Sequence, residues 1–205
     1  MFDLPPPDPE IEIRAASQGM SKGLRQTDGP QLLIEPELAF GAVVLGAYLK
    51  NVSSPTADAE TGVSPGLRGA AGGFDLTASA TLKLALGDRG GDRRALEFQA
   101  AVSRRVGRLT PRFSLTYSPD DLAATGWSLY AQAGAELSLF EGASASAAIA
   151  RRERAGGPDY TAFNAGASYA IARNFTADLR YYDTAQGRLG AIYAPRVVAA
   201  LRVHF

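Results

Sequence analysis

The residues "GWSLYAQAGAELSLF" (126–140) give the clearest indication of the fold class. Every second position is apolar, namely Trp127, Leu129, Ala131, Ala133, Ala135, Leu137 and Leu139, and the positions between them are polar or glycine. This period-two alternation predicts a β-strand with one apolar and one polar face. The segment is longer than the roughly 5–6 residues of a usual soluble strand. It matches the roughly 9–11 residues with which a tilted strand crosses a bilayer.

The same alternation recurs along the chain, whereas 22 glycines and 12 prolines interrupt any helical periodicity. It predicts an all-β protein with twelve strands, at about 10–19, 31–40, 42–52, 61–72, 74–86, 95–106, 109–118, 126–140, 143–153, 159–171, 174–184 and 190–205. The terminal "RVVAALRVHF" (196–205) alternates to the last residue. We therefore expect it to pair with the first strand and the eleventh, which would remove both sheet edges.

The predicted connections alternate between two lengths. Those after even strands are tight, at Gly41, 72–73, 107–109, 141–142 and 172–173, and those after odd strands are longer and polar. This pattern predicts a transmembrane antiparallel up-and-down β-barrel with short periplasmic turns and longer extracellular loops. The loops are short for a porin, and none is obviously long enough to form a constriction folded into the barrel. "SPDD" (118–121) holds oxygen ligands but lacks the spacing of a calcium loop, which favours a solvated loop over a cation-binding loop.

Alternation alone leaves open whether the apolar face points into a core or out into lipid. The aromatic residues favour lipid, because they gather at the strand ends and leave an aliphatic band between two belts, as the two bilayer interfaces select. The belt expected at the short-turn edge comprises Phe40, Phe74, Phe140, Phe175 and Phe205. The belt expected toward the long loops comprises Phe98, Tyr117, Trp127, Phe163 and Tyr181. A soluble, lipocalin-like binder remains the alternative.

The opposite face carries charges of both signs. Its pore-lining candidates are Glu12, Arg14, Glu35, Glu37, Lys50, Arg68, Asp75, Lys83, Glu97, Arg112, Glu136, Asp178, Arg180 and Arg202. Because roughly eight strands already give an interior that side chains fill, twelve predict a wet polar lumen. The seven acids and seven bases predict either weak ion selectivity or a lumen closed by ion pairs. Glu35 and Glu37 share one face two residues apart, and such a pair could serve acid/base work or bind a cation. We expect them instead to pair with lumen arginines such as Arg14, Arg112, Arg180 and Arg202.

The composition argues against other classes of function. The formal net charge is zero, which gives no basic footprint for nucleic acid, and no cysteine is present. His204 is the only histidine, and no nucleophile or second base accompanies it, so we predict neither an enzyme nor a metal or cofactor site. No run of about 18 apolar residues predicts a transmembrane helix.

Several segments resemble the TorF-type porin family of bacterial outer-membrane proteins. "SKGLRQTDGPQLLIEPEL" (21–38) resembles its "RGxSQTDxxPAxQGxxxY" stretch, and "VVLGAYLKNV" (43–52) resembles its "GFYxGxWxSNV" strand. "LTYSPDDL" (115–122) is similar to its "YYSPDY", and 159–184 is similar to its late hairpin ending in "YYDT". The family's tryptophan is Tyr48 here. The terminal "RVHF" resembles the aromatic signature read during barrel assembly, which implies an assembly signal at Leu201, Val203 and Phe205.

These observations predict a periplasmic proline-rich segment at 1–9 and one outer-membrane barrel domain at 10–205, with both termini in the periplasm and a signal peptide outside this numbering. The expected partners are the lipid bilayer, the barrel assembly machinery and small polar solutes. The favoured function is a porin for passive diffusion through a charged lumen. The alternative is a non-conducting, structural or loop-presenting barrel.

Overall fold

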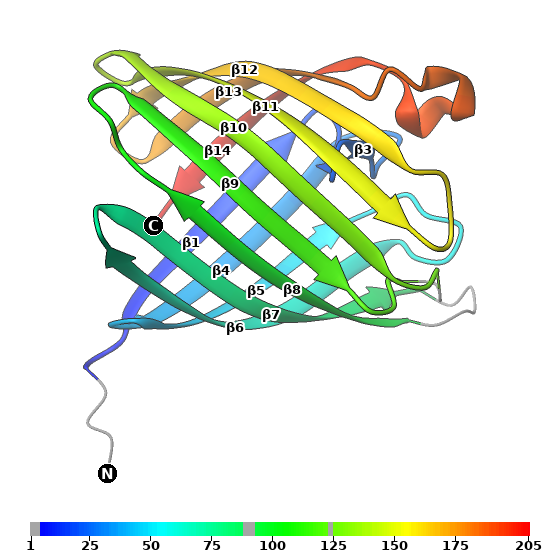
Figure 1. Cartoon of the computed structure of the whole chain (residues 1–205), viewed down its shortest axis with the longest axis horizontal. Coiled ribbons are helices and arrows are strands. Elements are labelled where there is room, and N and C mark those ends of the chain that lie inside the picture. The colour runs from blue at the N-terminus through cyan, green and yellow to red at the C-terminus, as the bar shows by residue number, and fades with distance from the viewer. Residues whose placement is uncertain (1–4, 88–92, 123–124) are drawn as a thin grey trace.

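A computed structural model describes residues 5–87, 93–122 and 125–205 (Figure 1). Within them, twelve strands form one closed antiparallel barrel in the order β1-β14-β13-β12-β11-β10-β9-β8-β7-β6-β5-β4. The strands are β1 (Asp8–Ala16), β4 (Gln31–Phe40), β5 (Val43–Asn51), β6 (Ala59–Ala71), β7 (Phe74–Leu86), β8 (Arg94–Ser103), β9 (Leu109–Ser118), β10 (Ser128–Phe140), β11 (Ala143–Arg154), β12 (Tyr160–Ala172), β13 (Phe175–Asp183) and β14 (Arg196–His204). The predicted fold class is confirmed.

The last strand closes the barrel as expected. β14 pairs with β13 on one side and with β1 on the other, where Glu12 lies opposite His204. The Phe205 N–H donates to the Ile11 carbonyl at 3.0 Å, and the Ile11 N–H donates back at 3.2 Å. The final residue is therefore tied into the sheet by its backbone.

The strand boundaries differ from the prediction mainly at the two ends. β1 covers Asp8–Ala16 rather than 10–19. The last strand begins at Arg196 rather than 190, because two 3-10 turns, η1 (Gly187–Leu189) and η2 (Ala191–Tyr193), precede it. The alternation of apolar and polar residues does not extend through these turns. Tyr193 is buried in the barrel mouth, in the cluster that contains Leu24 and Tyr160.

The two ends of the barrel differ as the connections predicted. The tight turns, the start of β1 and the C-terminus lie at one end, and the longer loops lie at the other (Figure 1). Gly41, Gly72 and Gly142 have φ of +66°, +61° and +75°, a conformation that glycine adopts without strain. Of the predicted long loops, 87–94 and 118–126 each include residues outside the described ranges, namely 88–92 and 123–124.

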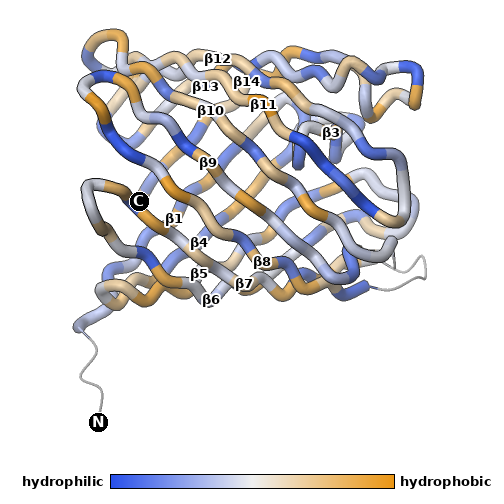
Figure 2. Tube along the Cα trace, in the orientation of Figure 1, coloured by the Kyte–Doolittle hydropathy of each residue, from blue (hydrophilic) through white to orange (hydrophobic). Residues whose placement is uncertain are grey.

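Apolar side chains cover the outside of the barrel. Leu67 and Val197 on the wall are each 60% exposed, and hydrophobic and hydrophilic positions alternate along each strand (Figure 2). Nine of the ten belt aromatics are exposed and Phe40 is partly exposed. Phe40 and Phe140 end their strands, while Phe74 and Phe175 begin theirs, all at tight turns. No helix among the described residues is long and apolar enough to span a membrane.

A short hairpin is the main departure from the predicted fold. β2 (Met20–Ser21) and β3 (Leu24–Arg25) pair with each other and not with the barrel wall. Figure 1 shows β3 inside the outline of the barrel, near the long-loop end. The expectation that no loop folds inward is therefore wrong.

Candidate functional site

Two adjacent cavities occupy the short-turn half of the lumen. One has a volume of about 450 Å³ and is lined by Arg112, Glu136 and Arg180 among polar neighbours. The other, about 520 Å³, is lined by acidic residues of β1 and β4. Gln99 on β8 lines both. This half of the barrel interior is therefore an open, polar space.

The structure places the fourteen predicted lumen residues in three groups. Glu12, Glu35, Glu37, Arg68, Arg112, Glu136 and Arg180 line the two short-turn cavities. Lys50, Lys83, Glu97 and Asp178 belong to ion pairs on the inner wall. The third group lies on the same alternating face of its strands as these inward residues and comprises Arg14, Asp75 and Arg202. Arg14 lies directly opposite Arg202, and Asp75 lies opposite Ser103.

Four glutamates form a ladder across β1 and β4. Glu12 lies directly opposite Glu35, and Glu10 lies opposite Glu37. Like charges facing each other across strands are destabilising. Glu37 pairs with Arg68, a lumen arginine on β6, at 3.4 Å, which agrees with the expectation that these carboxylates pair with lumen arginines. Arg180 instead contacts Asp178 at 3.2 Å.

The long-loop half of the lumen holds the β2–β3 hairpin. Its tip, Lys22–Gly23, has φ of +50° and +81°, so both turn residues adopt the left-handed conformation of a tight two-residue hairpin. Glycine suits that conformation, whereas lysine adopts it at a cost that surrounding contacts must offset. Those contacts come from the barrel wall.

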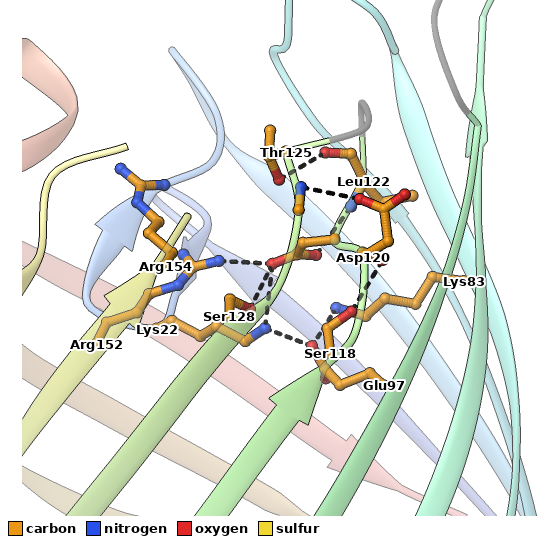
Figure 3. A network of polar contacts seen from close by, with 12 residues as sticks. Lys22, Lys83, Glu97, Ser118, Asp120, Leu122, Thr125, Ser128, Arg152 and Arg154 are labelled. Atoms are coloured by element: carbon orange, nitrogen blue, oxygen red, sulfur yellow. Dashed lines mark hydrogen bonds and ion pairs between the residues drawn. The ribbon is translucent and has the colours of Figure 1, made fainter. Parts of the chain in front are cut away.

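The Lys22 ammonium reaches carboxylates from two other parts of the barrel (Figure 3). It donates a hydrogen bond to Glu97 on β8 and lies 3.7 Å from Asp121 in the loop after β9. Lys83 on β7 shares Glu97 at 2.9 Å, and Arg152 on β11 shares Asp121 at 2.6 Å. All five side chains are 11–14% exposed, so solvent screens these ion pairs little.

Asp121 is the centre of the second half of this network, so the interpretation of "SPDD" as a solvated loop is wrong. The Ser128 hydroxyl donates to the Asp121 carboxylate at 3.1 Å, and the Leu122 N–H donates to the other oxygen of the same carboxylate at 3.0 Å. Burial would raise the pKa of Asp121, but Lys22, Lys83 and Arg152 together lower it to about 2. Burial and Lys83 lower the pKa of Lys22, and the two carboxylates oppose that shift.

The other face of the hairpin packs against apolar and aromatic groups. Leu24 is 6% exposed in a cluster with Tyr130, Ala150, Tyr160, Ala162 and Tyr193. The Tyr160 hydroxyl donates to the Lys22 carbonyl at 2.7 Å and accepts from Arg152 at 3.3 Å. The hairpin is thus held by both packing and polar contacts.

The sequence did not point to Lys22 at the hairpin tip or to Asp121, Arg152 and Tyr160, which contact the hairpin or its ion pairs. The dipeptide Lys22–Gly23 is a signal that could have found it, since a glycine in a two-residue turn is typical of tight hairpins. The flanking strands have only two residues each, too few for any periodicity. No group of three or more metal-ligating side chains that could hold a metal ion occurs among the described residues.

A closed antiparallel barrel that is apolar outside and polar inside, with tight turns at one end, is the architecture of outer-membrane porins and channels. The structure of the KdgM porin matches with a TM-score of 0.69 at 10% identity, covering 96% of this chain and 99% of that one. The NanC porin matches with a TM-score of 0.67 at 7% identity, covering 95% and 98%.

The COG4313 outer membrane channel from Pseudomonas putida F1 matches with a TM-score of 0.55 at 11% identity, covering 100% of this chain and 96% of that one. At these identities the likeness establishes the fold. No family model and no curated protein matches the sequence.

Proposed function

We propose that this chain is an outer-membrane channel for the passive diffusion of small polar solutes, with its tight turns and both termini in the periplasm. One observation carries the proposal: the barrel is apolar outside and encloses two polar cavities of about 450 and 520 Å³ inside. A soluble binding barrel would place its apolar side chains inside, where burial stabilises them. Charged lumen walls would orient polar solutes and set weak ion selectivity.

Short oligosaccharides are one solute class to test, because KdgM was solved in complex with a disordered oligogalacturonate. Conductance across a planar lipid bilayer tests the channel itself. The purified, folded protein is expected to give stable single-channel steps that heat unfolding abolishes. A folded protein that inserts and stays silent would contradict an open channel.

The non-conducting barrel remains the second candidate, and the inward hairpin favours it. The hairpin and its ion pairs occupy the long-loop half of the lumen. If these contacts close the lumen completely, the protein would serve as a structural or loop-presenting barrel. The same bilayer recording separates the two candidates.

We also propose that the chain is a TorF-type family member. The resembling segments support this, since they supply Lys22 at the hairpin tip, its ion-pair partner Asp121 and the packing residue Tyr160. Segments far apart in sequence therefore meet at one structural feature. A solved TorF-type barrel with an outward first loop would argue against this assignment.

A further inference from the structure

We infer that the β2–β3 hairpin is the size-limiting constriction of the lumen and that the Lys22 clamp, the ion pairs of Lys22 with Glu97 and Asp121, holds it across the pore; this inference rests on the proposed channel function.

The hairpin loop contacts widely separated parts of the wall. Gly23 and Leu24 pack toward β12, and Lys22 reaches Glu97 on β8. Gln26, just beyond β3, accepts a hydrogen bond from Lys50 on β5 at 3.2 Å. In the barrel order, three strands separate β12 from β8, and two separate β8 from β5. Contacts on such separate arcs place the loop across the lumen and not along one side of it.

The base of the hairpin is closed on itself. The Gln26 N–H donates to the Gly19 carbonyl at 2.8 Å, and the Gly19 N–H donates to the Thr27 hydroxyl at 2.7 Å. Thr27 is 1% exposed. The segment Met20–Arg25 is therefore a unit with joined ends, held to the wall by its tip and by Met20, which packs against the cluster of Ala16, Val198 and Ala200.

The space beside the hairpin is smaller than the space beyond it. A cavity of about 290 Å³ lies between the hairpin, Glu60, Lys83 and Arg152, compared with about 450 and 520 Å³ in the short-turn half. Gln99 lines both larger cavities and lies two positions from Glu97 on the same inward face of β8. The clamp therefore lies directly between the loop end and the wide part of the lumen.

The inference predicts that removing the hairpin widens the pore. Met20–Arg25 can be excised by joining Gly19 to Gln26 through an Asn-Gly turn, because the native hydrogen bond already brings these residues together. We expect single-channel conductance to rise about twofold or more, and larger polyethylene glycols to enter the pore. Heat-shifted gel mobility and circular dichroism confirm that the barrel has folded.

A point substitution provides a second test that preserves the loop. Lys22→Asn keeps the left-handed turn, which asparagine tolerates, but removes the ammonium from Glu97 and Asp121. Arg151→Asn is the matched control, since Arg151 is a half-exposed mouth cation that pairs with Asp159 at 3.3 Å and does not contact the hairpin. Lys22→Asn should increase the conductance or its fluctuations, and Arg151→Asn should leave both unchanged.

The outcomes separate the constriction from the channel function. If the wild type conducts and neither the excision of Met20–Arg25 nor Lys22→Asn changes its conductance, the hairpin is not the constriction, while the channel function stands. If the folded wild type, the excised variant and Lys22→Asn all show no single-channel conductance, the channel function is overturned. A silent wild type with a conducting excised variant would support the hairpin as a complete closure and overturn an open resting pore.

Discussion

The Tyr160 hydroxyl donates a 2.7 Å hydrogen bond to the backbone carbonyl of Lys22, 138 residues away in the sequence. This bond joins the first strand of the late hairpin β12–β13 to the tip of the first loop. Tyr160 has no exposed surface, so its hydroxyl cannot exchange this partner for bulk water. The bond therefore depends on the hairpin staying inside the barrel.

Tyr160→Phe should loosen the hairpin without emptying the cluster around Leu24. It leaves the partly buried carbonyl of Lys22 and one N–H of Arg152 without the tyrosine hydroxyl as a partner, which costs about 1–3 kcal/mol of stability. Amide hydrogen exchange at residues 20–25 should accelerate. Tyr169→Phe is the matched control, because Tyr169 is 52% exposed on the outer wall and should leave exchange in the hairpin unchanged. Equal exchange in both variants would contradict a structural role for the bond.

Gly23→Ala should destabilise the docked hairpin by about 1–3 kcal/mol through overpacking. The added Cβ would lie 2.4 Å from the Cβ of Ala162 on β12. Gly107→Ala provides the control, since its φ of +62° carries a similar backbone cost but no atom lies within 4 Å of its added Cβ. The difference in urea midpoint between the two variants gives the part of the destabilisation that comes from the steric overlap with Ala162. Ala162→Gly should restore part of the loss only in the Gly23→Ala background.

The stability of the clamp should fall in acid because of Asp121. Its pKa is lowered from 3.8 to about 2 in the folded protein, so its contribution is fully present above pH 3.8 and is lost as the pH falls through about 2. A shift of this size corresponds to about 2 kcal/mol. Urea unfolding between pH 2 and 6 should show a steeper acid decline for the wild type than for Asp121→Asn. Parallel curves would contradict the clamp, and Asp159→Asn serves as an exposed control.

The acidic ladder should bias the lumen toward cations. Glu12 and Glu35 face each other across β1 and β4 and line the cavity of about 520 Å³. Replacing both with glutamine should lower the cation-to-anion permeability ratio about twofold, measured as the reversal potential in a salt gradient. Arg112→Gln, in the adjacent cavity, should move the ratio in the opposite direction. If the double glutamine variant and Arg112→Gln shift the reversal potential in the same direction, the permeability ratio does not follow the charge of the lumen.

The strands could be predicted and the inner network could not, for a physical reason. Strands such as β10 repeat one simple rule over thirteen residues, and the position of each side chain follows from the pleat. The clamp instead joins Lys22, Glu97 and Asp121, whose proximity follows from barrel closure and loop geometry and not from any local pattern. The alternation along β8 predicts that Glu97 faces the lumen, but it carries no information about Lys22, the partner of Glu97 on the hairpin.

Two adjacent residues on β10 test which face of the barrel meets lipid. Ala133 is exposed on the outer face near the middle of the strand, whereas Gln132 lines the cavity of about 450 Å³. Ala133→Arg should cost about 2–4 kcal/mol of stability in a bilayer, because it places a charge against the hydrocarbon core. Gln132→Arg adds the same side chain to a wet lumen and should cost much less. Urea unfolding in lipid vesicles measures both. The order would reverse if the apolar face enclosed a soluble core, since Gln132 would then face bulk water and Ala133 would be buried.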